Sequence, residues 1–216
     1  MGLPPLSTAQ LDTLTTSNLP PSQLFETLSH YESEACLTAA GPGSTDPHLL
    51  SLFYSSFFIV HLLTDQVPEA RALTQRMPET LRSQDPSLQN CLALLRALWQ
   101  NQHAQVYHIL RDLPWPETLQ PLVRRYESFF QDKTLIAVSS SYEAIRPAVA
   151  ANYLGLDEQA AEKGDPSIIQ KFTGVGWTWD GEAELLHPKP IPTAATDAQS
   201  SNRIQEAMGM LGGRGS

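Results

Sequence analysis

The side chains of this chain that could bind a metal or attack a substrate lie far apart in the sequence. The six histidines are His30, His48, His61, His103, His108 and His187. None belongs to an H-E-x-x-H motif or to an H-x-H pair near supporting acids, the spacings that bring zinc ligands together. Gly174-x-Gly176 lacks the third glycine of a dinucleotide loop, and Trp177 follows where a helix should begin. The sequence therefore offers no catalytic, metal-binding or cofactor-binding residue, and we expect no enzyme.

Cys36 and Cys91 lie on separate predicted helices, which favours reduced, buried thiols over a disulfide framework. The first residues show no basic region followed by an apolar one, so they predict no secretion signal. The most apolar run, residues 49–63, is shorter than the roughly 20 residues of a membrane span. We therefore expect the chain in a reducing compartment, without a membrane partner.

Trp177 and Trp179 are candidates for binding another protein, because large flat side chains often anchor interfaces. Asp180-Gly181 follows them and predicts a tight turn between two short strands. Residues two apart on a strand share a face, so both tryptophans should point the same way. The expected partner contacts on this ribbon are Trp177, Trp179, Leu185 and His187. The alternative is that both tryptophans pack on the core of their own domain.

Residues 135–192 predict the small winged helix that must position this ribbon. Its first helix has apolar residues at helical spacing from Leu135, with Asp132 as its expected cap, and Pro147 opens the second. The third is interrupted near Gly164, and the ribbon, or wing, follows.

Many winged helices bind DNA with a basic helix and a basic wing, but the charges of this chain have the opposite sign. The chain has 14 Lys and Arg against 23 Asp and Glu, a net charge of −9. The acids of the third helix region and the wing are Asp157, Glu158, Glu162, Asp165, Asp180, Glu182 and Glu184. Such a surface repels phosphates, so we expect no nucleic acid as a partner. A stand-alone nucleic-acid binder remains the alternative from another functional class.

The chain before the winged helix predicts helices only. Residues 1–45 form N-terminal helices and residues 46–134 form helical repeats, in which Asp46-Pro47 and Asp85-Pro86 are typical helix starts. The helix after Asp46 is apolar nearly all round, as expected for a central helix. Similar residues recur 36 positions apart: Leu52 and Leu88, Ile59 and Leu95, Leu62 and Leu98, Leu73 and Ile109, Met77 and Leu113, Pro78 and Pro114. This period is typical of stacked helix pairs of the tetratricopeptide type.

Residues 193–216 predict a flexible tail, because they are small and polar up to a short helix at residues 203–211. That helix has apolar side chains on one face: Ile204, Ala207, Met208 and Leu211. A helix of this length is unstable alone in water, so we expect it to dock on a partner.

The complete pattern is a mostly α chain, in which a helical-repeat solenoid continues into a C-terminal winged helix with a small β-ribbon, followed by the tail. It resembles the PCI-domain family and, within it, the COP9 signalosome subunit 8 family over residues 48–192. The resemblance rests on residues 106–145, Leu154-Gly155-Leu156, Gly176-Trp177 and Pro188-Lys189-Pro190. The chain departs from the family at Gly164-Asp165-Pro166, which breaks a helix that the family usually keeps whole.

The resemblance implies a non-catalytic scaffold subunit of the complex that removes Nedd8 from cullin-RING ubiquitin ligases, with the zinc chemistry in another subunit. The implied partners are other signalosome subunits, especially subunit 3 and a common bundle of C-terminal helices, and cullin-RING ligases indirectly. The winged-helix edge and the tail helix would make these contacts. A small PCI subunit of the proteasome lid or of translation initiation factor 3 is the alternative within the family.

Overall fold

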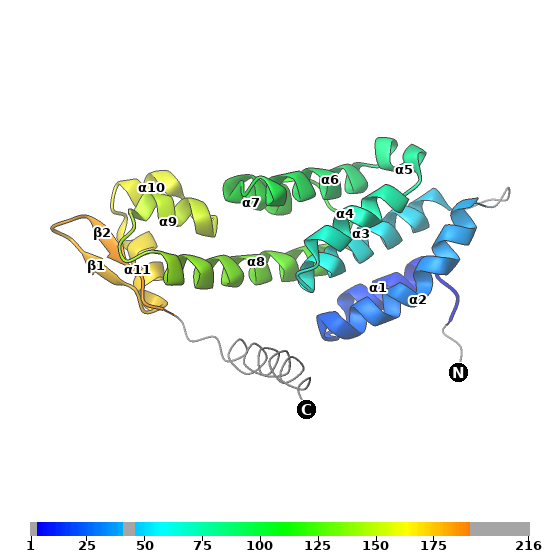
Figure 1. Cartoon of the computed structure of the whole chain (residues 1–216), viewed down its shortest axis with the longest axis horizontal. Helices are drawn as coiled ribbons and strands as arrows, with labels where there is room; N and C mark the ends of the chain where they lie inside the picture. Colours follow the sequence, from blue (N-terminus) through cyan, green and yellow to red (C-terminus); the bar gives the residue numbers. More distant parts are fainter. Residues whose placement is uncertain (1–3, 41–45, 191–216) are drawn as a thin grey trace, which may run out of the picture. The chain divides into compact units, whose positions relative to one another are not determined.

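The computed structural model describes residues 4–40 and 46–190, which are mostly helical with one small antiparallel sheet (Figure 1). The contacts within the chain define two units. Of the described residues, unit 1 holds those up to Asp132 together with Asn152–Gly155, and unit 2 holds Lys133–Ala151 and those from Leu156 to Pro190. The sequence placed its domain boundaries after residues 45, 134 and 192, and these remain predictions.

Unit 1 is built from helices, several of which begin where the sequence has a helix-start signal. Its helices are α1 (Thr8–Thr16), α2 (Pro21–Ala40), α3 (Pro47–Leu63), α4 (Val67–Arg76), α5 (Glu79–Gln84), α6 (Pro86–Trp99) and α7 (His103–Asp112). The carboxylates of Asp46 and Asp85 accept backbone N–H groups at the starts of α3 and α6, and a proline follows each at the first helical position. These two predicted helix starts are confirmed.

α3 is the central helix of unit 1. Every residue from Leu50 to Leu63 is buried, and α3 contacts α1, α2, α4 and α6. Figure 1 shows this helix between its neighbours. A helix with no polar face must be covered on all sides, so the prediction from its composition is confirmed.

The backbone repeats with the predicted offset of 36 residues. α4 and α7 both have 10 residues and start 36 positions apart, at Val67 and His103. The turns before them correspond, since Asp65 and Asn101 have positive φ angles of 59° and 54°. Asp and Asn tolerate this left-handed conformation better than most residues. α3 with α4 and α6 with α7 are therefore two copies of one helix pair.

The two cysteines are free and lie in different surroundings. Cys91 is buried, and its burial raises the pKa of the thiol to about 12, which keeps the thiol protonated and unreactive. Cys36 is exposed. The expectation of two buried thiols is therefore wrong for Cys36.

His61 is a histidine within this core and is only 4% exposed. Its Nδ1 lies 3.1 Å from Oε1 of Gln66, and its ring packs against Phe25 and Phe57. Its Nε2 is buried without a hydrogen-bond partner in the described chain. Burial lowers the pKa of His61 below 6.5, because the positive charge is poorly solvated there.

We expect the free energy of unfolding of unit 1 to fall as the pH drops below about 6.5. The unfolded chain then binds a proton at His61 more readily than the folded chain does. His61→Phe keeps a ring of similar size and removes this titration. Urea unfolding at pH 7.5 and pH 5.0 should show a smaller pH-dependent loss in the variant. Equal losses in the two proteins would contradict the assignment.

α8 (Gln120–Ser141) is one unbroken helix, and Asp132 lies in its interior. The prediction that Asp132 caps a separate helix is wrong. After Pro121 in the first turn, α8 contains no proline or glycine, so the backbone hydrogen bonds continue past the aspartate.

Unit 2 has the elements of a winged helix. After the end of α8 come α9 (Pro147–Leu154), whose last residues belong to unit 1, then α10 (Glu158–Glu162), α11 (Pro166–Gly174), β1 (Thr178–Asp180) and β2 (Leu185–His187). The predicted break near Gly164 is confirmed: Gly164 has a φ of +69°, and the Asp165 carboxylate caps α11.

The wing turn is longer than predicted. Residues 181–184 connect the strands, and the positive φ lies at Glu184 instead of Gly181. The Asp180 carboxylate accepts the N–H groups of Glu182 and Ala183, which fixes the start of the loop. Asp180 stabilises the loop through its carboxylate, and neither Asp180 nor Gly181 has the positive φ of a tight turn. The prediction of a two-residue Asp-Gly turn is therefore wrong.

Candidate functional site

Trp177 lies in the core of unit 2 and is only 2% exposed. Its ring stacks on Phe172 at 5.3 Å between centroids, and its Nε1–H donates to the hydroxyl of Ser139 at 3.0 Å. Ser139 is itself buried, so both polar groups are satisfied away from water. The expectation of an exposed partner contact at Trp177 is therefore wrong, and the core alternative holds for this residue.

Trp179 is half-buried and remains partly accessible. It pairs with Leu186 across the ribbon, and directly paired residues lie on one face. Leu186 is fully buried, so this face of the ribbon points toward the interior of unit 2. Trp179 lies at the edge of that face.

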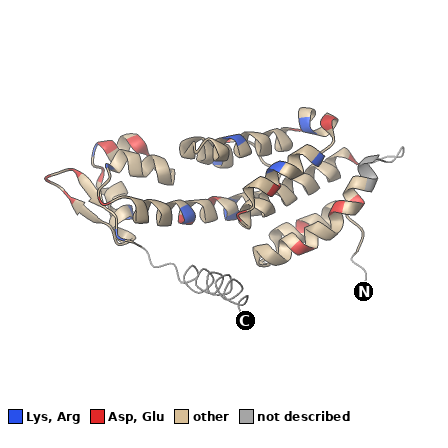
Figure 2. Cartoon of the chain, viewed as in Figure 1, with Lys and Arg blue, Asp and Glu red and all other residues tan. Residues whose placement is uncertain are grey.

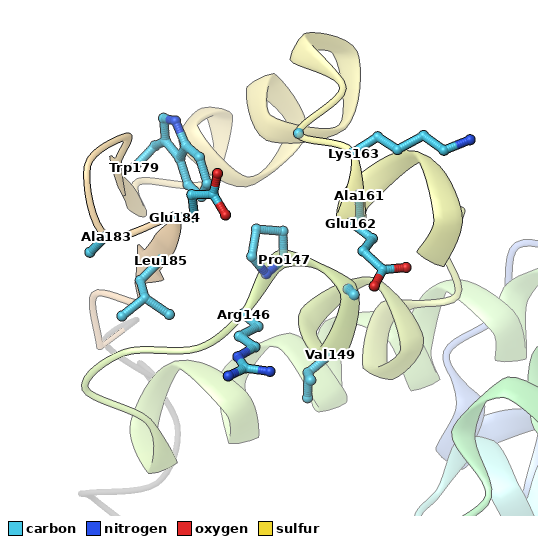
Figure 3. Close-up of a pocket in the computed structure, with 12 residues that line it drawn as sticks. Arg146, Pro147, Val149, Ala161, Glu162, Lys163, Trp179, Ala183, Glu184 and Leu185 are labelled. Carbon is cyan, nitrogen blue, oxygen red and sulfur yellow. The ribbon is translucent and has the colours of Figure 1, made fainter.

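A groove of about 460 Å³ lies beside Trp179. Figure 3 shows Trp179 and Glu184 on one side, Lys163 and Glu162 on the other, and Pro147 between them. The start of α9 and the end of α10 supply the helical walls, and Leu185 also lines the groove. An aromatic and aliphatic lining edged by charges of both signs suits a side chain of a protein partner.

The backbone of β1 offers a second binding feature. Leu186 exchanges both backbone hydrogen bonds with Ile145, at 2.8 and 2.9 Å. Because a residue in a strand directs both backbone groups to one side, Leu186 has none left for its other neighbour, Trp179. The N–H and C=O of Trp179 therefore point away from β2, to the outer edge of the ribbon. An extended segment of another protein could pair with this edge.

Leu185 and His187 flank Leu186 on β2 and are both half-buried. Nδ1 of His187 lies 3.1 Å from the carbonyl oxygen of Glu143 and donates a hydrogen bond to it, two residues before the ribbon contact at Ile145. Trp179, Leu185 and His187 all lie on the wing, but Leu185 and His187 are on the face opposite to Leu186 and Trp179. Their contact with a partner remains a prediction.

The wing is acidic. Asp180, Glu182 and Glu184 lie at its tip, and Figure 2 shows the acids of this region on the ribbon and α10. Backbone N–H groups of Ala183 and Glu182 lower the pKa of Asp180, so this carboxylate stays ionised even in mild acid. Two exposed lysines, Lys163 and Lys171, do not reverse the sign of the charge, which disfavours phosphate groups as ligands.

The predicted partner residues of the tail, Ile204, Ala207, Met208 and Leu211, lie outside the described residues. In residues 4–40 and 46–190, no three His, Cys, Asp or Glu side chains gather to hold a metal ion. None of the helices described here combines the length and hydrophobicity of a membrane span.

Two parts of this site could not be predicted from the sequence. Ile145 joins the sheet through a single residue pair, and one residue carries no alternating pattern. The helical walls of the groove come from the residues around Pro147 and Lys163, which are far from Trp179 in sequence. The break at Gly164 was the one available signal, since it ends α10 beside the groove.

A helical-repeat unit followed in the chain by a winged helix is the architecture of PCI-type proteins. The model of the CSN8/PSMD8/EIF3K family matches residues 48–197, and the chain belongs to this family. It is 52% identical over 220 residues, the full length of both chains, to "COP9 signalosome complex subunit 8" of Emericella nidulans. Proteins of the same name from Xenopus tropicalis and Danio rerio are 26% and 24% identical, covering 79% and 64% of this chain and 82% and 70% of theirs.

Proposed function

We propose that this chain is a non-catalytic scaffold subunit of a COP9 signalosome, the complex that removes Nedd8 from cullin-RING ligases. The identity of 52% over the whole of both chains to a signalosome subunit 8 carries this proposal. The family model also includes the proteasome and initiation factor subunits, so this full-length likeness favours the signalosome over those two assemblies.

The outer edge of β1 supports a docking role for the wing. It presents the backbone groups of Trp179 next to a groove that accepts a side chain, so a partner strand would gain both hydrogen bonds and buried area. We propose that a neighbouring subunit, the one corresponding to subunit 3, binds here and that the tail helix joins a bundle of C-terminal helices. The assembled protein would act in the cytoplasm and nucleus.

Affinity purification of the tagged full chain from its own cells, followed by mass spectrometry, tests the assignment. We expect the other signalosome subunits to be recovered in amounts similar to the tagged chain, with cullins present in smaller amounts. Recovery of proteasome lid or initiation factor subunits in their place would transfer the chain to a sibling assembly. Recovery of none of these would refute the assignment.

A pair of variants at Trp179 separates the side chain from the strand edge. Trp179→Ala removes the indole from the groove, and Trp179→Pro also removes the N–H that points outward. Proline is tolerated on an edge strand because the lost N–H makes no hydrogen bond within the sheet. In reconstitution with the neighbouring subunit we expect the proline variant to bind at least about tenfold more weakly than the alanine variant. Equal binding by the two variants would exclude strand pairing at this edge.

Deletion of residues 203–216 tests the second attachment. We expect the truncated chain to keep its helical fold and thermal unfolding, because a short helix on a small, polar tail adds little apolar surface to the core. Its incorporation into the complex should fall, as measured by size-exclusion chromatography of co-expressed subunits. The matched full-length variant Met208→Asp should show the same loss if the apolar face of the tail helix docks on the complex. Full incorporation of both proteins would refute the role of the tail.

A further inference from the structure

Trp99 lies on unit 1, in helices that the proposed function does not use, and it is the most exposed large hydrophobic side chain among the described residues. Its exposed fraction is 58%, whereas Trp115 and Trp177 are buried. It is the last residue of α6, beside α4, with which α6 is in contact. An indole this accessible is unusual in a chain that buries most of its aromatic rings.

Two arginines flank this indole. The guanidinium carbon of Arg71, on α4, lies 5.2 Å from the centroid of the Trp99 ring. Arg96 is three residues before Trp99 on α6, a spacing that makes them neighbours on the helix surface. We call these three residues the Trp99 patch, and Figure 2 shows basic residues on both helices.

Both arginines of the Trp99 patch are exposed and could bind a charged partner. Three other arginines of unit 1 form ion pairs: Arg76 with Glu32, Arg82 with Glu79 and Arg111 with Glu127. In the described ranges, no carboxylate lies within ion-pair distance of Arg71 or Arg96. Glu69 is near Arg71 in sequence, but residues two apart on a helix do not face each other. Two free guanidinium groups in a chain of net charge −9 thus form a local positive site.

We propose that the Trp99 patch is a docking surface for an acidic segment of another protein, in which one apolar side chain stands between Asp or Glu residues. The apolar side chain would pack on the indole, and the carboxylates would pair with the guanidinium groups. Arginine forms bidentate pairs with carboxylates, and Trp with Arg is a typical composition of interface hot spots. A nucleic acid fits less well, because two cations neutralise little of a polyphosphate while the rest of the acidic chain repels it.

Fluorescence anisotropy on the isolated full chain tests this proposal. The probe is a short fluorescein-labelled peptide with one phenylalanine between pairs of glutamates, and the reference peptide has lysines in place of the glutamates. We expect the acidic peptide alone to bind, and more weakly at higher salt because exposed charges are screened. The measurement uses the isolated chain, so its outcome is independent of whether the chain joins a signalosome.

The variants Trp99→Gln and Arg71→Gln with Arg96→Gln should each weaken binding by at least about tenfold. Their side chains are exposed, so thermal unfolding should stay unchanged. The matched control is Arg124→Gln, another exposed arginine of unit 1, and it should bind like the parent chain. Absence of binding at low salt, equal binding by all variants, or preferential binding of a single-stranded oligoadenylate would each overturn the proposal.

Discussion

Gly155→Ala should destabilise unit 1 by about 2 to 4 kcal/mol, through left-handed backbone strain and overpacking together. Gly155 has a φ of +63°, and a Cβ built there would lie 2.4 to 2.6 Å from ring carbons of Tyr107. Real side chains do not approach this closely, so the ring or the backbone has to move. Denaturant unfolding monitored by circular dichroism measures the loss.

The Tyr107 ring has little freedom to move aside. Its hydroxyl donates to the carbonyl of Tyr153 at 3.3 Å, and the guanidinium carbon of Arg111 lies 4.8 Å from its centroid. Arg111 also donates to the carbonyl of Gly155. The residue that a new methyl group would strike is therefore held from several sides.

Gly164→Ala is the matched control for this prediction. Gly164 has nearly the same φ, +69°, but nothing lies within 4 Å of a Cβ at that position. Its alanine variant should lose only the backbone term, about 1 kcal/mol. The excess cost at Gly155 should also shrink in a Tyr107→Leu background, where the ring is absent. Equal losses for the two glycines would show that contact with Tyr107 is unimportant.

Trp177→Ala should have the largest effect on unit 2, a loss of about 3 to 5 kcal/mol, because it removes a fully buried aromatic side chain. The variant would leave a cavity against Phe172 and an unpaired hydroxyl at Ser139. We expect little soluble protein at 37 °C, and a lower unfolding temperature for the fraction that folds.

Two further variants show whether the fold or the partner is affected. Trp179→Ala, at the half-buried neighbour, should cost about 1 kcal/mol or less, as is usual for partly exposed positions. Trp177→Phe keeps an aromatic ring on Phe172 and should fall between the two alanine variants. A stable, soluble Trp177→Ala protein that fails only in partner binding would reverse the assignment of the two tryptophans.

The sequence predicted the helices well where a local signal decides the backbone. The Asp-Pro pairs at 46–47 and 85–86 start α3 and α6 because a carboxylate caps the helix and proline fits its first position. The same reasoning was wrong at Asp132, where the flanking helical residues outweigh a weak cap signal. An aspartate predicts a helix start only when something also ends the preceding helix.

The wing shows the limit of periodicity. Alternation correctly relates Trp179 to the ribbon, but it cannot show which face points inward. That depends on the pairing of Leu186 with Ile145, on Ser139 and on Phe172, which are distant in sequence from the wing strands or lie on another element. The Trp99 patch could not be predicted from the sequence for the same reason, because Arg71 and Trp99 belong to different helices.

The matching turns at Asp65 and Asn101 have a consequence for how this protein can change in length. Each helix pair, or module, ends in the same way: an extended residue is followed directly by a proline, Pro78 in the first pair and Pro114 in the second. The backbone therefore leaves both modules in the same local conformation. Gain or loss of a whole 36-residue module would preserve the phase of every buried position that follows. An insertion of one or two residues within one of these helices would instead rotate the apolar face that follows by about 100° per residue. Duplication of a genetic segment coding for one module is thus a route by which such a solenoid grows without a new core.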